Sequence, residues 1–273
     1  MASPFEGKVC VVSGAGSGIG RAVAMNLARQ GAALAISDVN PATLEETRAM
    51  LPPSNRIRAD VLDVADADAI AAYAPKVKES LGSADYVFNI AGLSRVGDFE
   101  KTPLESFEKV MNVNFWGVVR MSKAFLPQLL ETRGGLINIS SVFGIIGVPG
   151  QAHYCASKFG VRGFSESPAQ ELDGRGVRVT TVHPGGVATN IAKLAEVDAL
   201  TARSGTKEQM VDRFAAVAKT SPDRAAEIIL KGVERGQRRV LIGNDASVIS
   251  WIQRLFPIGY PKWIARMTGS EGV

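Results

Sequence analysis

Short runs of apolar residues alternate along the chain with longer segments in which apolar residues recur every three or four positions. The short runs are almost continuously apolar, which is typical of parallel strands that are buried on both faces of a sheet. The longer segments have the spacing of amphipathic helices. The pattern predicts seven strands, at residues 8–14, 33–38, 56–61, 85–92, 135–141, 177–185 and 238–243.

Two of the predicted helices begin with clear capping signals. Asn40 is followed by Pro41, and Ser221 is followed by Pro222 in a segment that ends at Gly236. A polar cap, a proline in the first turn and a terminal glycine are typical of helix ends. Strands that alternate with helices predict an α/β fold, a Rossmann-like doubly wound parallel seven-stranded sheet with helices on both faces.

One connection is far longer than the others. Residues 189–220 contain no predicted strand, whereas about five residues is the usual length of a link. We expect this segment to form a helical lid over a substrate. After the last strand, residues 246–273 form a C-terminal extension of two short amphipathic pieces. No linker divides the chain, so we expect one domain over residues 1–273.

Composition narrows the classes of function. Of 273 residues, 46% are hydrophobic and 21% charged, as in ordinary soluble globular proteins. The net charge of +4 equals the excess from Arg235 onward, where six basic and two acidic residues give 6 − 2 = +4. The rest of the chain is neutral, so we expect no nucleic-acid partner. Cys10 and Cys155 have neither metal nor disulfide spacing, and no secretion signal is evident, which together favour a cytoplasmic protein without a metal.

A glycine-rich stretch, "SGAGSGIGR" at residues 13–21, joins the first strand to a helix. Such a loop lets backbone amides and a helix N-terminus approach a pyrophosphate, although it could also be a turn without a ligand. Asp38 ends the second strand, eighteen residues after Gly20. A carboxylate there would accept hydrogen bonds from ribose hydroxyls and repel a 2′-phosphate, which favours NAD over NADP.

Tyr154 and Lys158 stand four positions apart, so they share one face of a helix. Ser141 lies at the carboxyl end of a predicted strand, the edge where ligands bind in open α/β sheets. Each residue also has an ordinary interpretation: an interface aromatic, a solvated lysine and a strand-end cap. Cys155 has no orienting acid nearby, which favours a packed thiol over a nucleophile.

Taken together, these motifs resemble the short-chain dehydrogenase/reductase family. The resemblance rests on "SGAGSGIG" (13–20), Asp38, Asp63, "NIAG" (89–92), Asn114, "NISS" (138–141), Tyr154, Lys158 and "PGGVAT" (184–189). It implies that Tyr154 is the general acid/base and that Lys158 lowers the pKa of Tyr154. It also implies that Ser141 binds the reacting oxygen and that Asn114 supports a proton relay. The implied cofactor-binding residues are Gly14, Ser17, Gly18, Ile19, Gly20, Asp38, Asp63, Val64, Asn89, Ala91, Gly92, Tyr154, Lys158, Pro184, Gly185, Val187 and Thr189.

Two prolines fall inside predicted helices. The helix that carries Tyr154 should run to about Leu172, and an interior proline costs a helix about 3 kcal/mol. Pro168 therefore predicts a kink or an early end, and Pro75 predicts an interruption of the third helix. Members of the resembled family often pair through the helix of Tyr154. We expect a homodimer or homotetramer, with the tetramer packing put in doubt by Pro168.

The residues expected to surround a substrate are mostly apolar. The predicted pocket residues are Leu93, Val96, Phe143, Val148, Gln151 and Phe214, with Ile145, Val187 and the lid residues Leu194, Val197, Leu200 and Met210 also nearby. Such a pocket favours a hydrophobic substrate, although most of these side chains could instead pack on the protein itself. Arg95 indicates that an acidic group could be bound as well. The C-terminal extension would cover the substrate mouth or a neighbouring subunit, or make weak peripheral contact with a membrane.

The resemblance implies an NAD(H)-dependent oxidoreductase that interconverts a secondary alcohol and a ketone. A catalytically silent NAD-binding sensor or scaffold of the same fold is one alternative. A dehydrogenase of small polar hydroxy compounds, of the diol or hydroxyacyl type, is another.

Overall fold

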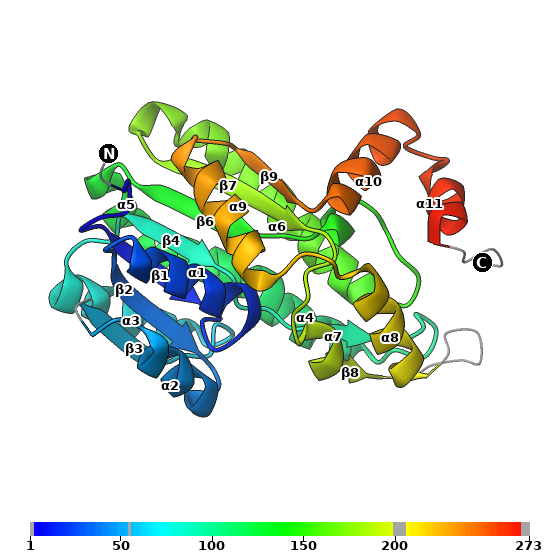
Figure 1. Cartoon of the computed structure of the whole chain (residues 1–273), viewed down its shortest axis with the longest axis horizontal. Helices are drawn as coiled ribbons and strands as arrows, with labels where there is room; N and C mark the ends of the chain where they lie inside the picture. The colour runs from blue at the N-terminus through cyan, green and yellow to red at the C-terminus, as the bar shows by residue number, and fades with distance from the viewer. Residues whose placement is uncertain (1–2, 54–55, 199–205, 269–273) are drawn as a thin grey trace.

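A computed structural model describes residues 3–53, 56–198 and 206–268. Its centre is a sheet of seven parallel strands in the order β3-β2-β1-β4-β6-β7-β9 (Figure 1). The strands are β1 (Val9–Ser13), β2 (Ala33–Asp38), β3 (Ile57–Val61), β4 (Tyr86–Asn89), β6 (Gly135–Ile139), β7 (Arg178–Pro184) and β9 (Arg239–Ile242). This is the doubly wound sheet that the apolar runs predicted, with β1 and β4 at the point where the strand order reverses.

Helices cover both faces of the sheet. One buried cluster joins the sheet to α1 (Gly18–Arg29), α2 (Pro41–Met50) and α9 (Pro222–Glu234). The opposite cluster contains residues of α3 (Ala67–Leu81), α5 (Gly117–Thr132) and α6 (Ala152–Glu171). The side chains of Asn40 and Ser221 cap α2 and α9 as predicted.

The expected interruption of the third helix at Pro75 and the expected early end of the Tyr154 helix at Pro168 are wrong. Helix α3 continues through Pro75, and α6 continues through Pro168 to Glu171, so neither helix is interrupted or ends early. A proline removes only its own amide donor, and the carbonyl of Pro168 still accepts from the Leu172 amide at 2.9 Å. Buried residues on both sides, Ser165 and Ala169, hold α6 against the body at this point.

The long connection between β7 and α9 is not free of strands, contrary to expectation. It contains α7 (Ile191–Leu194), the two-residue strand β8 (Glu196–Val197) and α8 (Lys207–Val217). Strand β8 pairs in parallel with β5 (Arg95–Val96), which follows β4 along the chain. Two-residue strands have no periodicity that a sequence pattern could reveal. Leu200, a predicted lid residue, lies outside the described residues.

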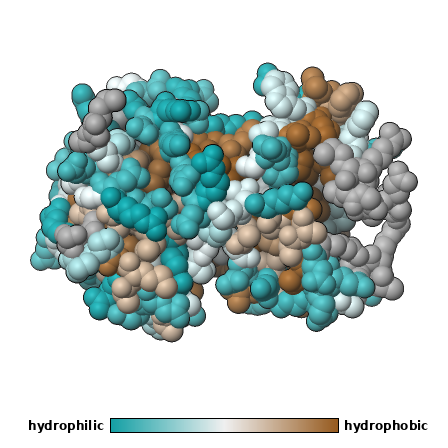
Figure 2. Space-filling view, viewed as in Figure 1, coloured by the Kyte–Doolittle hydropathy of each residue, from teal (hydrophilic) through white to brown (hydrophobic). Residues whose placement is uncertain are grey.

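The C-terminal helices α10 (Asn244–Leu255) and α11 (Tyr260–Thr268) project from the body at the upper right of Figure 1. Figure 2 shows hydrophobic side chains on this arm, and its exposed apolar residues include Trp251, Leu255, Ile258 and Trp263. The Gly147 amide donates to the Tyr260 hydroxyl at 3.0 Å, which ties the arm to the loop before α6. Among the described residues, every helix is too short or too polar to cross a membrane.

Candidate active site

The glycine-rich loop packs so tightly that side chains are excluded. Gly14 has a positive φ of 69°, and a Cβ there would lie 2.7 Å from the Cα of Ala91. At Gly20 a Cβ would lie 1.9 Å from the carbonyl oxygen of Gly14. The side chain of Thr189 reaches the other side of the loop at Gly18. The structure therefore brings the ends of β1, β4 and β7 together around the N-terminus of α1, where backbone amides face the carboxyl edge of the sheet.

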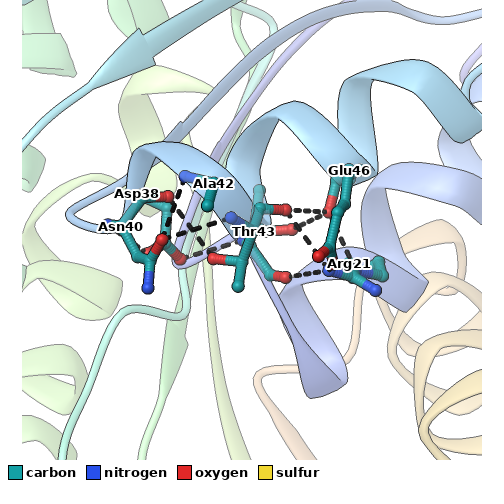
Figure 3. Close-up of polar contacts among 9 residues, drawn as sticks. Arg21, Asp38, Asn40, Ala42, Thr43 and Glu46 are labelled. Carbon is teal, nitrogen blue, oxygen red and sulfur yellow. Dashed lines mark hydrogen bonds and ion pairs between the residues drawn. The ribbon is translucent and has the colours of Figure 1, made fainter.

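Asp38 is fixed beside this loop by two backbone amides (Figure 3). Its Oδ2 accepts from the Gly16 amide and its Oδ1 from the Asn40 amide, both at 2.9 Å. Arg21 lies nearby on α1, but its Nη2 donates to Glu46 at 2.9 Å and to the Thr43 carbonyl at 3.2 Å. Arg21, which Figure 3 shows near Asp38, thus already has other hydrogen-bond partners. The sequence did not single out Arg21, because its partners lie on another helix.

Three further predicted cofactor residues, Asp63, Val64 and Asn89, differ in where their side chains lie. Asp63 is exposed and accepts from the Ala65 amide at 2.8 Å, whereas Val64 is buried against Gly117. The side chain of Asn89 turns into the protein instead, where its Nδ2 donates to Asn138 Oδ1 at 2.8 Å. The structure therefore gives the Asn89 side chain a role in holding β4 and β6 together.

Asp245 supports the "PGG" segment at the end of β7. Its Oδ2 accepts from the Gly186 amide at 2.7 Å, and a Cβ at Gly185 would collide with the same carboxylate. Asp245 lies in the first turn of α10, far from any motif. Sequence reasoning missed it, and the available signal was one acidic residue directly before the C-terminal extension.

The four predicted catalytic residues are all buried on the carboxyl side of the sheet. Tyr154 and Lys158 lie on α6, and the Lys158 ammonium is 5.6 Å from the centre of the Tyr154 ring. Ser141 follows β6, and its hydroxyl oxygen accepts from the Phe143 amide at 3.1 Å, so its hydroxyl proton can be donated toward Tyr154 or a substrate oxygen. Asn114 lies in a π-helical turn (Asn112–Trp116) between α4 (Leu104–Met111) and α5.

Burial controls the ionisation of Tyr154 and Lys158. It raises the pKa of Tyr154 to about 12, against a smaller opposing effect of the hydrogen bond from Ser141. It lowers the pKa of Lys158 to about 8. Desolvation disfavours the charged form of both residues and is the largest cause of both shifts. That Lys158 lowers the pKa of Tyr154 stays a prediction.

Asn114 connects the segment after β4 to α6. Its Oδ1 accepts from the Leu93 amide at 2.8 Å, and its Nδ2 donates to the Leu93 carbonyl at 2.9 Å and to Ser157 Oγ at 3.2 Å. These contacts fix Leu93 next to the helix that carries Tyr154. The structure thus shows a positional role for Asn114.

His183 lies beneath Ser141. Its Nδ1 is 3.0 Å from the Ser141 carbonyl oxygen, and because a carbonyl only accepts, Nδ1 carries the proton. Burial lowers the pKa of His183 to about 4, although the Ser141 carbonyl partly opposes this shift. A neutral His183 therefore supports the backbone of Ser141.

The predicted substrate-pocket residues differ in how deeply they are buried. Phe143 packs edge-on against Tyr154 with ring centres 6.2 Å apart. Ile145 is 1% exposed and belongs to the interior, whereas Leu194 is 73% exposed. Arg95 forms ion pairs with Glu196 and Asp198, so its charge is already balanced. The other predicted lining residues are half-buried or buried: Leu93, Val96, Val148, Gln151, Val187, Val197, Met210 and Phe214.

Cys155 is also buried, and burial raises the pKa of its thiol. A thiol in this environment is protonated at neutral pH and a poor nucleophile. The structure therefore agrees with the packed-thiol interpretation.

Comparison with known proteins gives consistent matches. The family model for short chain dehydrogenases matches residues 8–229. The chain is 41% identical over 269 residues to a putative oxidoreductase, SadH, of Mycobacterium tuberculosis, covering 96% of each chain. It is 36% identical over 231 residues to the 3-oxoacyl-[acyl-carrier-protein] reductase FabG of Thermotoga maritima, covering 83% of this chain and 90% of the reductase. A crystal structure from Burkholderia phymatum, in complex with NAD, has the same fold, with a TM-score of 0.83, 24% identity and coverage of 92% and 94% of the two chains.

Proposed function

The chain belongs to the short-chain dehydrogenase/reductase family, and from this premise we propose that it is an NAD(H)-dependent oxidoreductase interconverting a secondary alcohol and a ketone. One observation carries the proposal. Tyr154, Ser141 and Lys158 are buried together at the sheet edge that also holds the glycine-rich loop and Asp38. A silent sensor of the same fold would need the cofactor loop but not this set of side chains.

NAD held by the glycine-rich loop and Asp38 would supply the hydride chemistry of the proposed reaction. The Tyr154 hydroxyl exchanges a proton with the substrate oxygen, and the Ser141 hydroxyl donates a hydrogen bond to the same oxygen. Lys158 supplies positive charge on the same helix face as Tyr154. Because burial raises the pKa of Tyr154 to about 12, the residue is primarily a proton donor in ketone reduction.

The residues around the glycine-rich loop fit a dinucleotide. The absence of side chains at Gly14 and Gly20 lets the loop pack against Ala91 and lets α1 begin against the loop, which is the tight strand-to-helix turn of dinucleotide-binding folds. The carboxylate of Asp38 supports a preference for NAD over NADP, because it would repel a 2′-phosphate. Arg21 does not offset that repulsion, since it is engaged by Glu46.

The proposed substrate is hydrophobic. The side chains nearest Tyr154 include Phe143, and the one predicted cation, Arg95, is neutralised by Glu196 and Asp198. This favours an apolar ketone or alcohol over a small hydroxy acid. The similarity to a 3-oxoacyl-[acyl-carrier-protein] reductase keeps a hydroxyacyl substrate as the second candidate.

For the C-terminal arm, the contact between Tyr260 and the Gly147 amide favours packing over the substrate mouth. The exposed apolar residues of the arm suit a neighbouring subunit of a homodimer or homotetramer, and a membrane surface is the alternative. Co-sedimentation with liposomes that is lost on deleting residues 246–273, with activity retained, would favour the membrane.

The proposed function is tested by NAD⁺-linked oxidation over a panel of small diols, cyclic alcohols, steroids and hydroxyacyl thioesters. We expect NADH to form with one or more hydrophobic secondary alcohols. Turnover of small charged hydroxy acids alone would contradict the hydrophobic substrate. Tight NAD binding without turnover of any compound would favour the silent sensor.

A further inference from the structure

A buried carboxylate in the long connection between β7 and α9 lies close to the start of the catalytic helix. The Asp198 side chain is 2% exposed and directly follows β8. Its Oδ1 accepts from Ser106 Oγ at 2.6 Å and from Arg95 Nε at 3.1 Å. Burial alone would raise the pKa of Asp198, but the hydrogen bonds from Arg95 and Ser106 outweigh this effect and hold the pKa below its usual value. Asp198 is therefore a charged group at neutral pH.

His153 stands between Asp198 and Tyr154. Its Nδ1 accepts from the Tyr154 backbone amide at 2.9 Å, so in the neutral ring the proton is on Nε2. That Nε2 lies 3.5 Å from Asp198 Oδ2, and the ring packs against Phe107. Burial lowers the pKa of His153, with Asp198 opposing, so the ring is neutral at pH 7. The negative charge of Asp198 favours the tautomer that His153 needs to accept from Tyr154.

The hydrogen bond to Tyr154 satisfies a helix end. The first amides of a helix have no intrahelical partner, and Gln151, which precedes α6, caps none of them with its side chain. The ring of His153 instead accepts the hydrogen bond from the amide of Tyr154, the proposed acid/base. The position of the Tyr154 backbone therefore depends on His153.

We propose that His153 and Asp198 are positioning residues through which the β7–α9 connection fixes Tyr154 for reaction. The chain of contacts runs from β8 through the Asp198 carboxylate and the His153 ring to the Tyr154 amide. The effect on turnover rests on the proposed function, whereas the effect on the first turn of α6 does not. A group that positions a reacting residue changes kcat strongly for small displacements.

The test compares His153→Phe, His153→Asn, Asp198→Asn and Glu196→Gln by amide hydrogen exchange of the peptide around residues 152–156 and by steady-state kinetics. Phenylalanine keeps the ring and removes both contacts. Asparagine places its Oδ1 near the position of Nδ1, so it restores the acceptor for Tyr154 but not the contact with Asp198. Glu196 is the matched control, because it also pairs with Arg95 but does not touch His153.

We expect His153→Phe to speed exchange at the start of α6 and to lower kcat about tenfold, with the KM for NAD unchanged. His153→Asn should recover most of both losses, Asp198→Asn should change both in the direction of His153→Phe, and Glu196→Gln should leave both near wild type. Wild-type exchange and kcat in His153→Phe would overturn the proposal, and so would equal losses in Asp198→Asn and Glu196→Gln. Should the wild-type enzyme turn over no alcohol, the proposed function fails, and exchange alone decides the positioning role.

Discussion

The ammonium group of Lys158 lies 5.6 Å from the ring centre of Tyr154 and donates a hydrogen bond to the Ile139 carbonyl at 3.0 Å. Both side chains are almost completely buried, and Asp and Glu are absent from the contacts described for this ammonium. A buried cation without a carboxylate destabilises a folded protein. Lys158 therefore lowers the stability of the fold, although it serves the proposed reaction at Tyr154.

Replacing Lys158 with methionine should stabilise the fold while abolishing turnover. The pKa of Lys158 falls from 10.5 to about 8 on folding, which corresponds to about 3 kcal/mol of lost stability at pH 7. Methionine is an apolar side chain of similar length, so it should recover part of this lost stability. We expect the free energy of unfolding to rise by about 1–2 kcal/mol. Denaturant unfolding measures the change. The exposed Lys123→Met should be neutral, and a destabilised Lys158→Met would contradict the argument.

The same substitution has a pH dependence of known sign. Between pH 8 and 10.5 the unfolded chain binds the Lys158 proton and the folded chain does not, so wild-type stability gains from this residue as the pH rises. The advantage of Lys158→Met should therefore shrink across this window. Unfolding curves of both proteins at pH 7.5 and 10 provide the comparison, and a constant difference would rule out the shift.

Removing the Tyr154 hydroxyl should stop turnover and spare cofactor binding. Tyr154→Phe keeps the ring that packs against Phe143, so the structure should be preserved. Loss of a general acid/base costs about 10²–10⁴-fold in rate. NADH formation and NAD titration measure the two properties separately. Tyr73→Phe, at another buried tyrosine, is the control, and a Tyr154→Phe enzyme with wild-type kcat would exclude the assignment.

The charge of Asp38 should determine the choice of dinucleotide. Asp38→Asn keeps an oxygen for one of its two backbone amides and removes the repulsion toward a 2′-phosphate. We expect the KM for NAD⁺ to rise about tenfold and NADP⁺ to become a measurable cosubstrate, at similar kcat. Glu45→Gln, an exposed change on α2, should leave both cosubstrates unaffected. Unchanged selectivity in Asp38→Asn would show that other groups set the preference.

Acid should destabilise the protein partly through His183. Its pKa is about 4 in the folded chain and 6.5 without the fold, so the unfolded chain takes up the proton first. Stability is then lost as the pH falls from 6.5 toward 4, by about 3 kcal/mol for this residue. His183→Asn retains a donor for the Ser141 carbonyl without a titrating ring. Its stability should fall less steeply over this range than that of the wild type, as measured by denaturant unfolding at several pH values.

The parts of the fold that depend on local pattern were predictable, and the parts that depend on distant contacts were not. The central strands appear as apolar runs because parallel strands are buried on both faces, whereas the edge strand β3 is half-buried and carries Arg58 and Asp60. Pro75 and Pro168 misled because packing of α3 and α6 outweighs a local preference. The sequence did not indicate a role for Asp198, because that role depends on contacts with His153 and Arg95, which are far away along the chain. The effect of burial on the pKa of Tyr154 could not be predicted for a similar reason, because burial is a property of the whole fold.

The two ends of the connection between β7 and α9 are joined to each other. Val187 and Thr220 form a parallel bridge, the Ala188 amide donates to the Thr220 carbonyl at 2.8 Å, and the Thr220 amide donates to the Gly186 carbonyl at 3.2 Å. The entropy of closing a loop grows slowly with its length, so a segment clamped at its base tolerates insertions and replacements. For protein engineering, the connection is thus open to exchange wherever it does not hold the site, that is, outside Thr189 and Asp198. Grafts that keep these two residues in place would retune which molecules are accepted and leave the sheet and its cofactor edge untouched.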